Sequence, residues 1–209
     1  KLKTCNLSKP LVDPSRAAMP TAALDAAAER AGALLSGRGD TVAVVESTSA
    51  GLVNAALQGV PKASSYLVGA LTVYSLTAAR GVLPREVLEQ LGRPRDNYAS
   101  ASAYRESKRT FCLALARHAR ARFGATWAVA ESGAAEIEGL PAQLKAAGVF
   151  TALAVVGPQG FEHCVFLDLS AAAGAAPSRR EAMQAFALGA LEVLEDAVKK
   201  SGGNSASQL

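Results

Sequence analysis

Apolar residues recur every three or four positions in three long segments of the chain, a spacing typical of helices with one buried side. The expected helices run from Pro20 to a stop within Gly37–Asp40, over Ala99–Arg122, and over a final segment containing Met183, Phe186, Ala190, Leu194 and Val198. Two shorter patterns predict brief helices over Leu52–Leu57 and Arg85–Leu91. The chain is therefore expected to be rich in amphipathic helices.

Between these helices lie short apolar runs without strict alternation, as in strands buried on both faces. The predicted strands are Thr41–Glu46, Tyr66–Tyr74, Thr126–Ala130, Val149–Val156 and Phe161–Leu169. A Gly- and Pro-containing link joins the last two, which predicts a hairpin. Helices that alternate with strands, together with one hairpin, predict an α/β fold: a three-layer α/β/α sandwich with a mixed sheet.

Neither end of the chain shows the spacing of apolar residues that is typical of a helix or of a strand. Residues 1–19 are basic and aperiodic, and we interpret them as an N-terminal extension that is flexible or derived from a targeting peptide; they lack the apolar core of a secretory signal. Residues 20–200 form the expected α/β domain, and residues 201–209 are expected to be a disordered tail.

Composition narrows the class of protein. Half of the 209 residues are hydrophobic, yet no apolar run approaches the ~20 residues of a membrane-spanning helix. Cys5, Cys112 and Cys164 are too widely spaced for a disulfide framework or a zinc site. We therefore expect no membrane span, no metal and no cofactor. A reducing intracellular compartment fits best, either the cytoplasm or an organelle such as a mitochondrion or plastid.

The net charge of +4 is concentrated partly on one predicted helix. Its cationic residues are Arg105, Lys108, Arg109, Arg117, Arg120 and Arg122. Such a face could bind phosphate, but no aromatic platform or nucleic-acid motif accompanies it, which favours a solvated helix surface and argues against nucleic acid as a partner.

Candidate chemistry lies in the turn after the first strand. In open α/β sheets, ligands bind beyond the carboxyl ends of the strands. Ser47, Thr48 and Ser49, with Gly51, could bind a phosphate or an oxyanion there; from the residues alone, capping of the next helix is the favoured interpretation. A second small-residue turn, Ser132–Ala135, could converge on the same pocket or be an ordinary exit from a strand.

Five short motifs, in order and spacing, resemble the CinA C-terminal domain family, the nicotinamide-nucleotide amidohydrolases, over roughly residues 22–198. VESTSAGL at 45–52 is similar to the family's AESCTGGL, VPKAS at 60–64 to VPGAS, GALTVYS at 69–75 to GGVVTYS, GATWAVAESG at 124–133 to GADLGIAVTG, and KAAG at 145–148 to KPVG.

The resemblance implies an activity and a set of site residues. Family members hydrolyse the carboxamide of nicotinamide mononucleotide to release ammonia, without a metal, using a serine activated by a lysine, and they commonly self-associate. Ser47 would be the nucleophile. The residues implied to bind substrate are Thr48, Ser49, Gly51, Tyr74, Ser132, Gly133 and Lys145.

One departure from the family pattern affects catalysis directly. The family's lysine lies five positions after the tyrosine, and Ala79 occupies that position here. A serine hydroxyl is a poor nucleophile without a base, and the neighbouring Arg80 stays protonated. Glu46, Glu131 and His163 are the other candidate bases, but we expect Glu46 to orient the turn by hydrogen bonding and His163 to have a structural role. We therefore expect a relative with weak or lost deamidase activity, or alternatively a non-catalytic structural or interaction subunit of a larger assembly.

Overall fold

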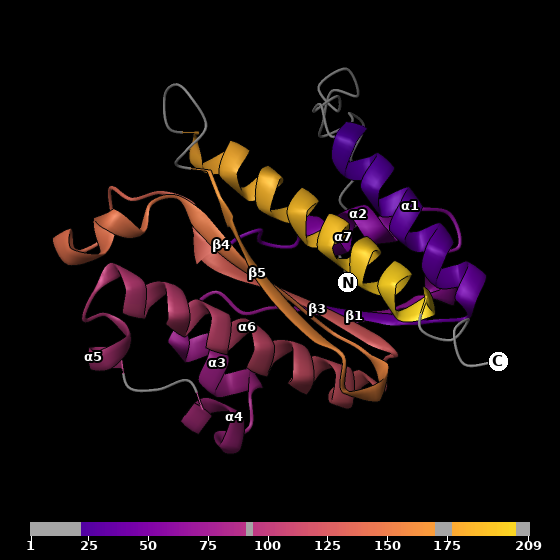
Figure 1. Cartoon of the computed structure of the whole chain (residues 1–209), viewed down its shortest axis with the longest axis horizontal. Helices are drawn as coiled ribbons and strands as arrows, with labels where there is room; N and C mark the ends of the chain where they lie inside the picture. Colours follow the sequence, from indigo (N-terminus) through magenta and orange to yellow (C-terminus); the bar gives the residue numbers. More distant parts are fainter. Residues whose placement is uncertain (1–21, 91–93, 170–176, 204–209) are drawn as a thin grey trace, which may run out of the picture.

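Five strands form one mixed sheet in the order β2-β1-β3-β4-β5 in the computed structural model, which describes residues 22–90, 94–169 and 177–203 (Figure 1). The strands are β1 (Val42–Glu46), β2 (Leu67–Thr72), β3 (Trp127–Ala134), β4 (Phe150–Val156) and β5 (Glu162–Asp168). Strand β1 runs parallel to β2 and β3, whereas β4 is antiparallel to β3 and β5. The predicted mixed sheet and hairpin are confirmed.

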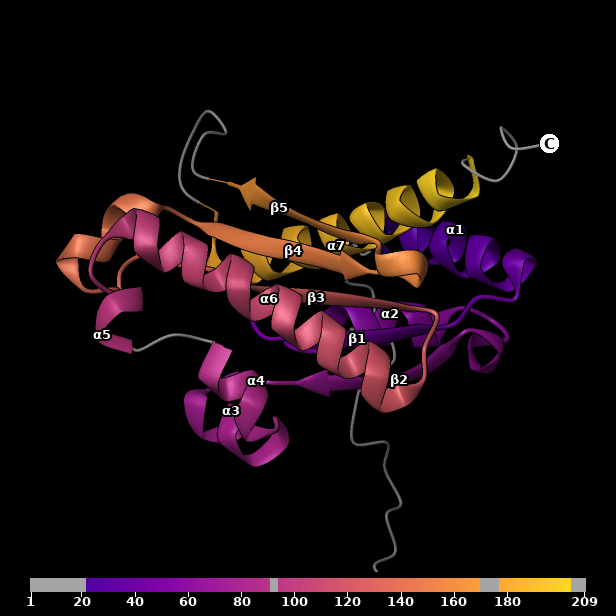
Figure 2. The same ribbon diagram turned by 60° about the horizontal axis from the view of Figure 1, so that its bottom comes forward.

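Helices cover both faces of this sheet (Figures 1 and 2). One layer contains α1 (Ala22–Arg38), α2 (Leu52–Gly59) and α7 (Arg179–Gly203); the other contains α3 (Leu76–Val82), α4 (Arg85–Gln90) and α6 (Ala101–Phe123). The helix α5 (Pro94–Asn97) and three 3-10 turns, at Ala63–Ser65, Ala142–Ala147 and Pro158–Gly160, complete the elements. This arrangement is the predicted three-layer sandwich.

The buried strands account for the two hydrophobic layers. Every residue of β1 and β4 is buried. Along β1, Val42 and Val44 pack toward α1, α2 and α7, while Ala43 and Val45 pack toward α6. Successive strand residues point to opposite faces, so an uninterrupted apolar run is what a strand with helices on both sides requires.

Several element boundaries differ from those expected. Strand β3 continues to Ala134, so Ser132 and Gly133 lie in the strand instead of a turn. Helices α3 and α5 were not predicted, and α7 extends to Gly203 into the expected tail. The remaining tail residues, 204–209, and the whole N-terminal extension, 1–19, lie outside the described residues, as does Leu91 at the end of the predicted helix Arg85–Leu91.

Four arginines of α6 contact the sheet or the segment that leads into it. Arg105 binds Asp168, Arg117 binds Glu162, and Arg109 donates to the carbonyl of Cys164. All three contacts reach β5, and Arg120 donates to the carbonyl of Thr126. The favoured expectation of a solvated helix face therefore holds only in part: Arg117 and Arg122 are exposed, whereas the other arginines are partly buried by contacts that attach α6 to the sheet.

None of the helices in the described part of the chain is long and apolar enough to cross a membrane.

Candidate functional site

The candidate site lies where the parallel strands β1, β2 and β3 reach their carboxyl ends. Ser47 follows β1 directly, and Tyr74 follows β2 by two residues. In the register of the sheet, Glu46 of β1 lies opposite Glu131 of β3. Polar residues that were predicted to lie on separate turns are therefore brought together at the carboxyl ends of these strands.

Glu46 caps α2 and fixes the turn that precedes it. Its carboxylate accepts from the backbone N–H groups of Gly51 (2.9 Å), Val53 (3.0 Å) and Asn54 (2.8 Å). These N–H groups have no partner within the helix, and a carboxylate is well suited to the positive end of a helix dipole. The expectation that a turn hydroxyl caps α2 was wrong, whereas the expected orienting role of Glu46 is confirmed.

Glu131 holds the same turn from the neighbouring strand. Its Oε2 accepts from the backbone N–H groups of Thr48 (2.9 Å) and Ser49 (2.8 Å), and its Oε1 accepts from Thr151 Oγ1 at 2.6 Å. Ser49 Oγ lies 2.7 Å from Glu46 Oε2 and 2.8 Å from Glu131 Oε2, so it bridges the two carboxylates. Two buried acidic side chains thus organise the turn, and all their carboxylate oxygens accept hydrogen bonds.

Ser47 is the residue of the turn that lines both cavities of the site. Two adjoining cavities, of about 140 Å³ and about 250 Å³, share Ser47, Tyr74 and Lys108 in their walls. A combined space of this order lies near the lower end of small-molecule sites, ~300–1,000 Å³. The backbone N–H of Ser47 donates to the carbonyl of Glu131 at 3.1 Å, which ties the serine to the sheet.

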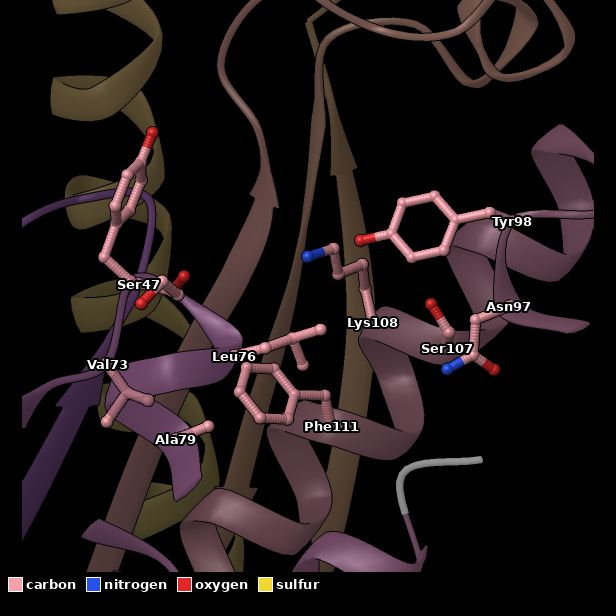
Figure 3. A pocket seen from close by; sticks show the side chains of 11 residues that line it. Ser47, Val73, Leu76, Ala79, Asn97, Tyr98, Ser107, Lys108 and Phe111 are labelled. Atoms are coloured by element: carbon pink, nitrogen blue, oxygen red, sulfur yellow. The ribbon is translucent and has the colours of Figure 1, made fainter. Parts of the chain in front are cut away.

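The two cavities differ in character. The smaller is lined largely by apolar and aromatic side chains: Val73, Leu76, Ala79, Tyr98 and Phe111 (Figure 3). The larger is lined by Thr48, Tyr104, Gly133, Ala134, Ala135, Glu136, Gly139, Leu140 and Arg179. Ser47 therefore lies at the junction of an apolar compartment and a more polar one.

Lys108 is the functional candidate that sequence reasoning missed. Its side chain extends from α6 into the cavity, and its Nζ donates to Ser132 Oγ at 3.4 Å and lies 5.2 Å from the centroid of the Tyr104 ring (Figure 3). Desolvation lowers the pKa of this ammonium below its ordinary value of 10.5, although the nearby Cys112 and Glu131 oppose the shift. A signal was present: Lys108 lies four residues after Tyr104 and three before Phe111, on the apolar side of the helix.

Besides Lys108, the polar compartment has Arg179 in its wall. Arg179, at the start of α7, donates from Nη1 to Glu136 Oε1 at 2.8 Å and from Nη2 to Tyr74 Oη at 3.0 Å. Both ion-pair partners are partly exposed. The arrangement could receive an anionic group through Arg179, but only in competition with Glu136.

The structure brings together some of the predicted site residues and separates others. Ser47, Thr48, Tyr74 and Gly133 line the cavities. Gly133 is required by close packing, because a Cβ there would lie 2.0 Å from the carbonyl oxygen of Phe150.

The remaining predicted residues do not line this cleft. Ser49 and Gly51 contribute to the hydrogen bonds that hold the turn, and Lys145 is exposed on the 3-10 turn Ala142–Ala147. Ser132 is fully buried and is connected to the cleft through Lys108. In the described ranges, no three or more His, Cys, Asp or Glu side chains are grouped so as to hold a metal ion.

Comparison with known proteins identifies relatives over most of this domain. The CinA C-terminal domain family matches residues 24–198. A CinA-like protein of Prochlorococcus marinus is 36% identical over 129 residues, which cover 61% of this chain and 27% of that protein. A CinA-like protein of Parasynechococcus marenigrum is 35% identical over 132 residues, covering 62% and 28%. The chain thus matches little more than a quarter of the length of these curated relatives.

Solved structures show the same fold. The competence/damage-inducible protein CihA from Agrobacterium tumefaciens superimposes with a TM-score of 0.65 at 23% identity, covering 84% of this chain and 95% of that one. A CinA superfamily protein from Klebsiella pneumoniae gives a TM-score of 0.64 at 20% identity, covering 85% and 98%. The three-layer sandwich is therefore shared with known members of the superfamily.

Proposed function

Because the chain belongs to the CinA C-terminal domain family, we propose that it binds an amide-bearing nucleotide of the nicotinamide mononucleotide class at Ser47 and deamidates it slowly. The observation that carries the proposal is the position of Ser47: its side chain lines both an apolar and a polar compartment, and Ala79 lines the apolar one where the family has its lysine. The proposal therefore takes Ser47 as the nucleophile and Ala79 as the residue that replaces the usual base.

The two compartments suit the two ends of such a ligand. A pyridine ring is flat and largely apolar, and the side chains of Leu76 and Phe111 offer it a matching surface. The ribose phosphate would extend into the polar compartment toward Arg179. In this pose the carboxamide carbon lies at the junction, where Ser47 is found.

Slow turnover follows from the chemistry at position 79. Removal of a general base typically costs ~10²–10⁴ in rate. The methyl group of Ala79 is buried in the hydrophobic layer and cannot accept a proton. Glu136 adds a further penalty, because its carboxylate competes with a phosphate for Arg179.

Release of ammonia from nicotinamide mononucleotide tests this proposal. We expect the purified protein to release ammonia at a rate about 10²-fold below that of a relative with lysine at the equivalent position, and we expect Ser47→Ala to abolish the release. Ammonia can be measured with a coupled dehydrogenase assay, and nicotinic acid mononucleotide by chromatography.

Two results would count against the proposal. Ammonia release that persists in Ser47→Ala would remove the serine from the mechanism, and failure of the wild-type protein to bind the mononucleotide in calorimetry would remove the ligand class.

A non-catalytic interaction subunit is the second candidate function. It is favoured by exposed apolar side chains beside the cleft: Leu76 is 50% exposed and Val82 is 42% exposed, both on α3. Stoichiometric co-purification with a partner, together with no mononucleotide binding, would support this function over the first.

A further inference from the structure

We propose that Lys108 of α6 accepts the proton of Ser47 and so takes the place of the lysine that is missing at position 79. This inference deepens the proposed function and rests on it for the identity of the substrate. The reactivity of Ser47 can be measured without the substrate, so this part of the inference can be tested separately.

The placement of the amine is the first argument. Lys108 lines both cavities that Ser47 lines, and Ala79 lies in the wall of one of them. Figure 3 shows the Lys108 side chain reaching from α6 into the space between Ser47 and Tyr98. An amine from a different helix therefore enters the same compartment that a lysine at position 79 would enter.

The surroundings of the amine favour a neutral form. Lys108 is half-buried, with the Tyr104 ring and Ser132 Oγ against its Nζ. The charged groups around it are Glu131 on β3 and, across the polar compartment, Glu136 and Arg179; the titratable groups are Cys112 on α6 and Tyr74, Tyr98 and Tyr104. The net effect on Lys108 is a lowered pKa, caused chiefly by desolvation. A larger share of the amine is thus available as a base at neutral pH than for an exposed lysine.

The other candidate bases are engaged or distant. The Glu46 carboxylate accepts three backbone N–H groups at the start of α2. Glu131 accepts from two N–H groups of the turn and from Thr151. His163 lies on β5, the edge strand opposite β2. These contacts leave Lys108 as the amine or carboxylate best placed to act on Ser47.

The proposed step conserves protons and bonds. The neutral Lys108 Nζ takes the Ser47 proton as Oγ forms a bond to the carboxamide carbon. The resulting ammonium returns that proton to the departing nitrogen as the carbon–nitrogen bond breaks, which releases ammonia. Water then attacks the acyl-serine: Lys108 takes a proton from the water and gives it back to Ser47 Oγ as the ester bond breaks, leaving the carboxylic acid product.

The hydrogen bond of Lys108 to Ser132 does not prevent the amine from acting on Ser47. In the free protein the amine is directed to Ser132 Oγ, at 3.4 Å. A bond this long is weak, so a change in the lysine side chain can redirect the amine to Ser47 when a ligand fills the cleft. Catalytic hydrogen bonds are often formed only in the substrate complex.

A fluorophosphonate probe tests the inference without a nucleotide. Such a probe labels an activated serine, and we expect labelling of Ser47, located by mass spectrometry, in the wild-type protein. The labelling rate should rise with pH along a limb whose midpoint lies below 10.5, the ordinary pKa of lysine, because the neutral amine is the active form. Lys108→Met should lower the rate by about 100-fold and remove this limb.

The variant Lys108→Arg distinguishes a role of Lys108 as a base from a structural or electrostatic role. Arginine keeps the charge and most of the length but cannot give up its proton. We expect it to label as slowly as Lys108→Met, while Lys200→Met, the same change on the exposed end of α7, labels like the wild type. Circular dichroism checks that each variant is folded. If Lys108→Met does not fold, the labelling rate of Lys108→Arg tests the inference.

Three results would overturn the inference: an unlabelled Ser47 in the wild-type protein, wild-type labelling in Lys108→Met, or wild-type labelling in Lys108→Arg. Labelling that depends on Lys108 without any ammonia from the mononucleotide would support the inference and contradict the proposed substrate. The two proposals therefore fail by different observations.

Discussion

Glu136 reduces the positive charge that the polar compartment offers to a ligand. Its carboxylate binds Arg179 Nη1 at 2.8 Å, next to the contact between Arg179 and Tyr74. A phosphate entering this compartment meets a guanidinium that is already partly neutralised. The residue therefore opposes the binding of an anionic nucleotide while leaving an uncharged nucleoside unaffected.

Replacement of Glu136 by glutamine should strengthen mononucleotide binding. Loss of the carboxylate frees Arg179 for the phosphate, and because the pair is partly exposed the gain is expected to be two- to fivefold, about 1 kcal/mol or less. Calorimetry with nicotinamide mononucleotide measures it. Glu192→Gln, an exposed change on α7, is the control and should have no effect; unchanged or weaker binding in Glu136→Gln would contradict this account of the compartment.

At the residue scale, the sequence predicted that Ser47 lies at the site but missed Lys108 and the contacts of Ser49 and Glu131. Ser47 follows a buried strand, and that pattern is local. Lys108 was grouped with the arginines of its helix, because composition counts charges without regard to the side of the helix they occupy. The roles of Ser49 and Glu131 depend on a contact between β1 and β3, more than 80 positions apart in the chain, and no local pattern encodes it.

At the element scale, the position of Ser47 depends on the junction between β1 and α2. Glu46 ends the strand and its carboxylate accepts the first N–H groups of the helix, so strand and helix are joined through one side chain. Ala50 and Gly51 turn the chain between them with positive φ angles of 56° and 98°. This short junction directs Ser47 toward the cleft.

Substitution of Glu46 by alanine should loosen this junction. Three backbone N–H groups lose their acceptor, which we expect to lower the free energy of unfolding by about 2–4 kcal/mol. Urea denaturation measures the change. Glu29→Ala, on the exposed side of α1, should cost less than about 0.5 kcal/mol. A loss below about 1 kcal/mol in Glu46→Ala would show that the carboxylate is not essential to the turn.

The elements that sequence reasoning misjudged are those stabilised by distant partners. Strand β3 was expected to end at Ala130 because polar and small residues follow. Pairing of Ser132 with Ala152 and of Gly133 with Thr151 continues the strand. Helix α3 was not predicted, although Ser75 supplies a recognisable cap: its Oγ accepts from the Ala78 N–H at 3.1 Å. That signal was present in the sequence and was overlooked.

At the scale of the whole molecule, the sheet divides into a parallel part that carries the site and an antiparallel part that anchors it. Strands β1, β2 and β3 end at the cleft, while β5 binds three arginines of α6. Because α6 also carries Lys108, its attachment to β5 fixes the position of that amine relative to Ser47. The fold class was predictable from the alternation of helices and strands, whereas this connection required the structure.

The central claim is that the cleft at Ser47 holds an amide-bearing mononucleotide with its carboxamide at the serine, and a crystal structure of Ser47→Ala with nicotinamide mononucleotide tests it most directly. We predict the pyridine ring against Leu76 and Phe111, the phosphate near Arg179, and the carboxamide carbon about 3–3.5 Å from where the serine oxygen would lie. A ligand bound elsewhere, or one whose phosphate occupies the apolar compartment, would contradict the account.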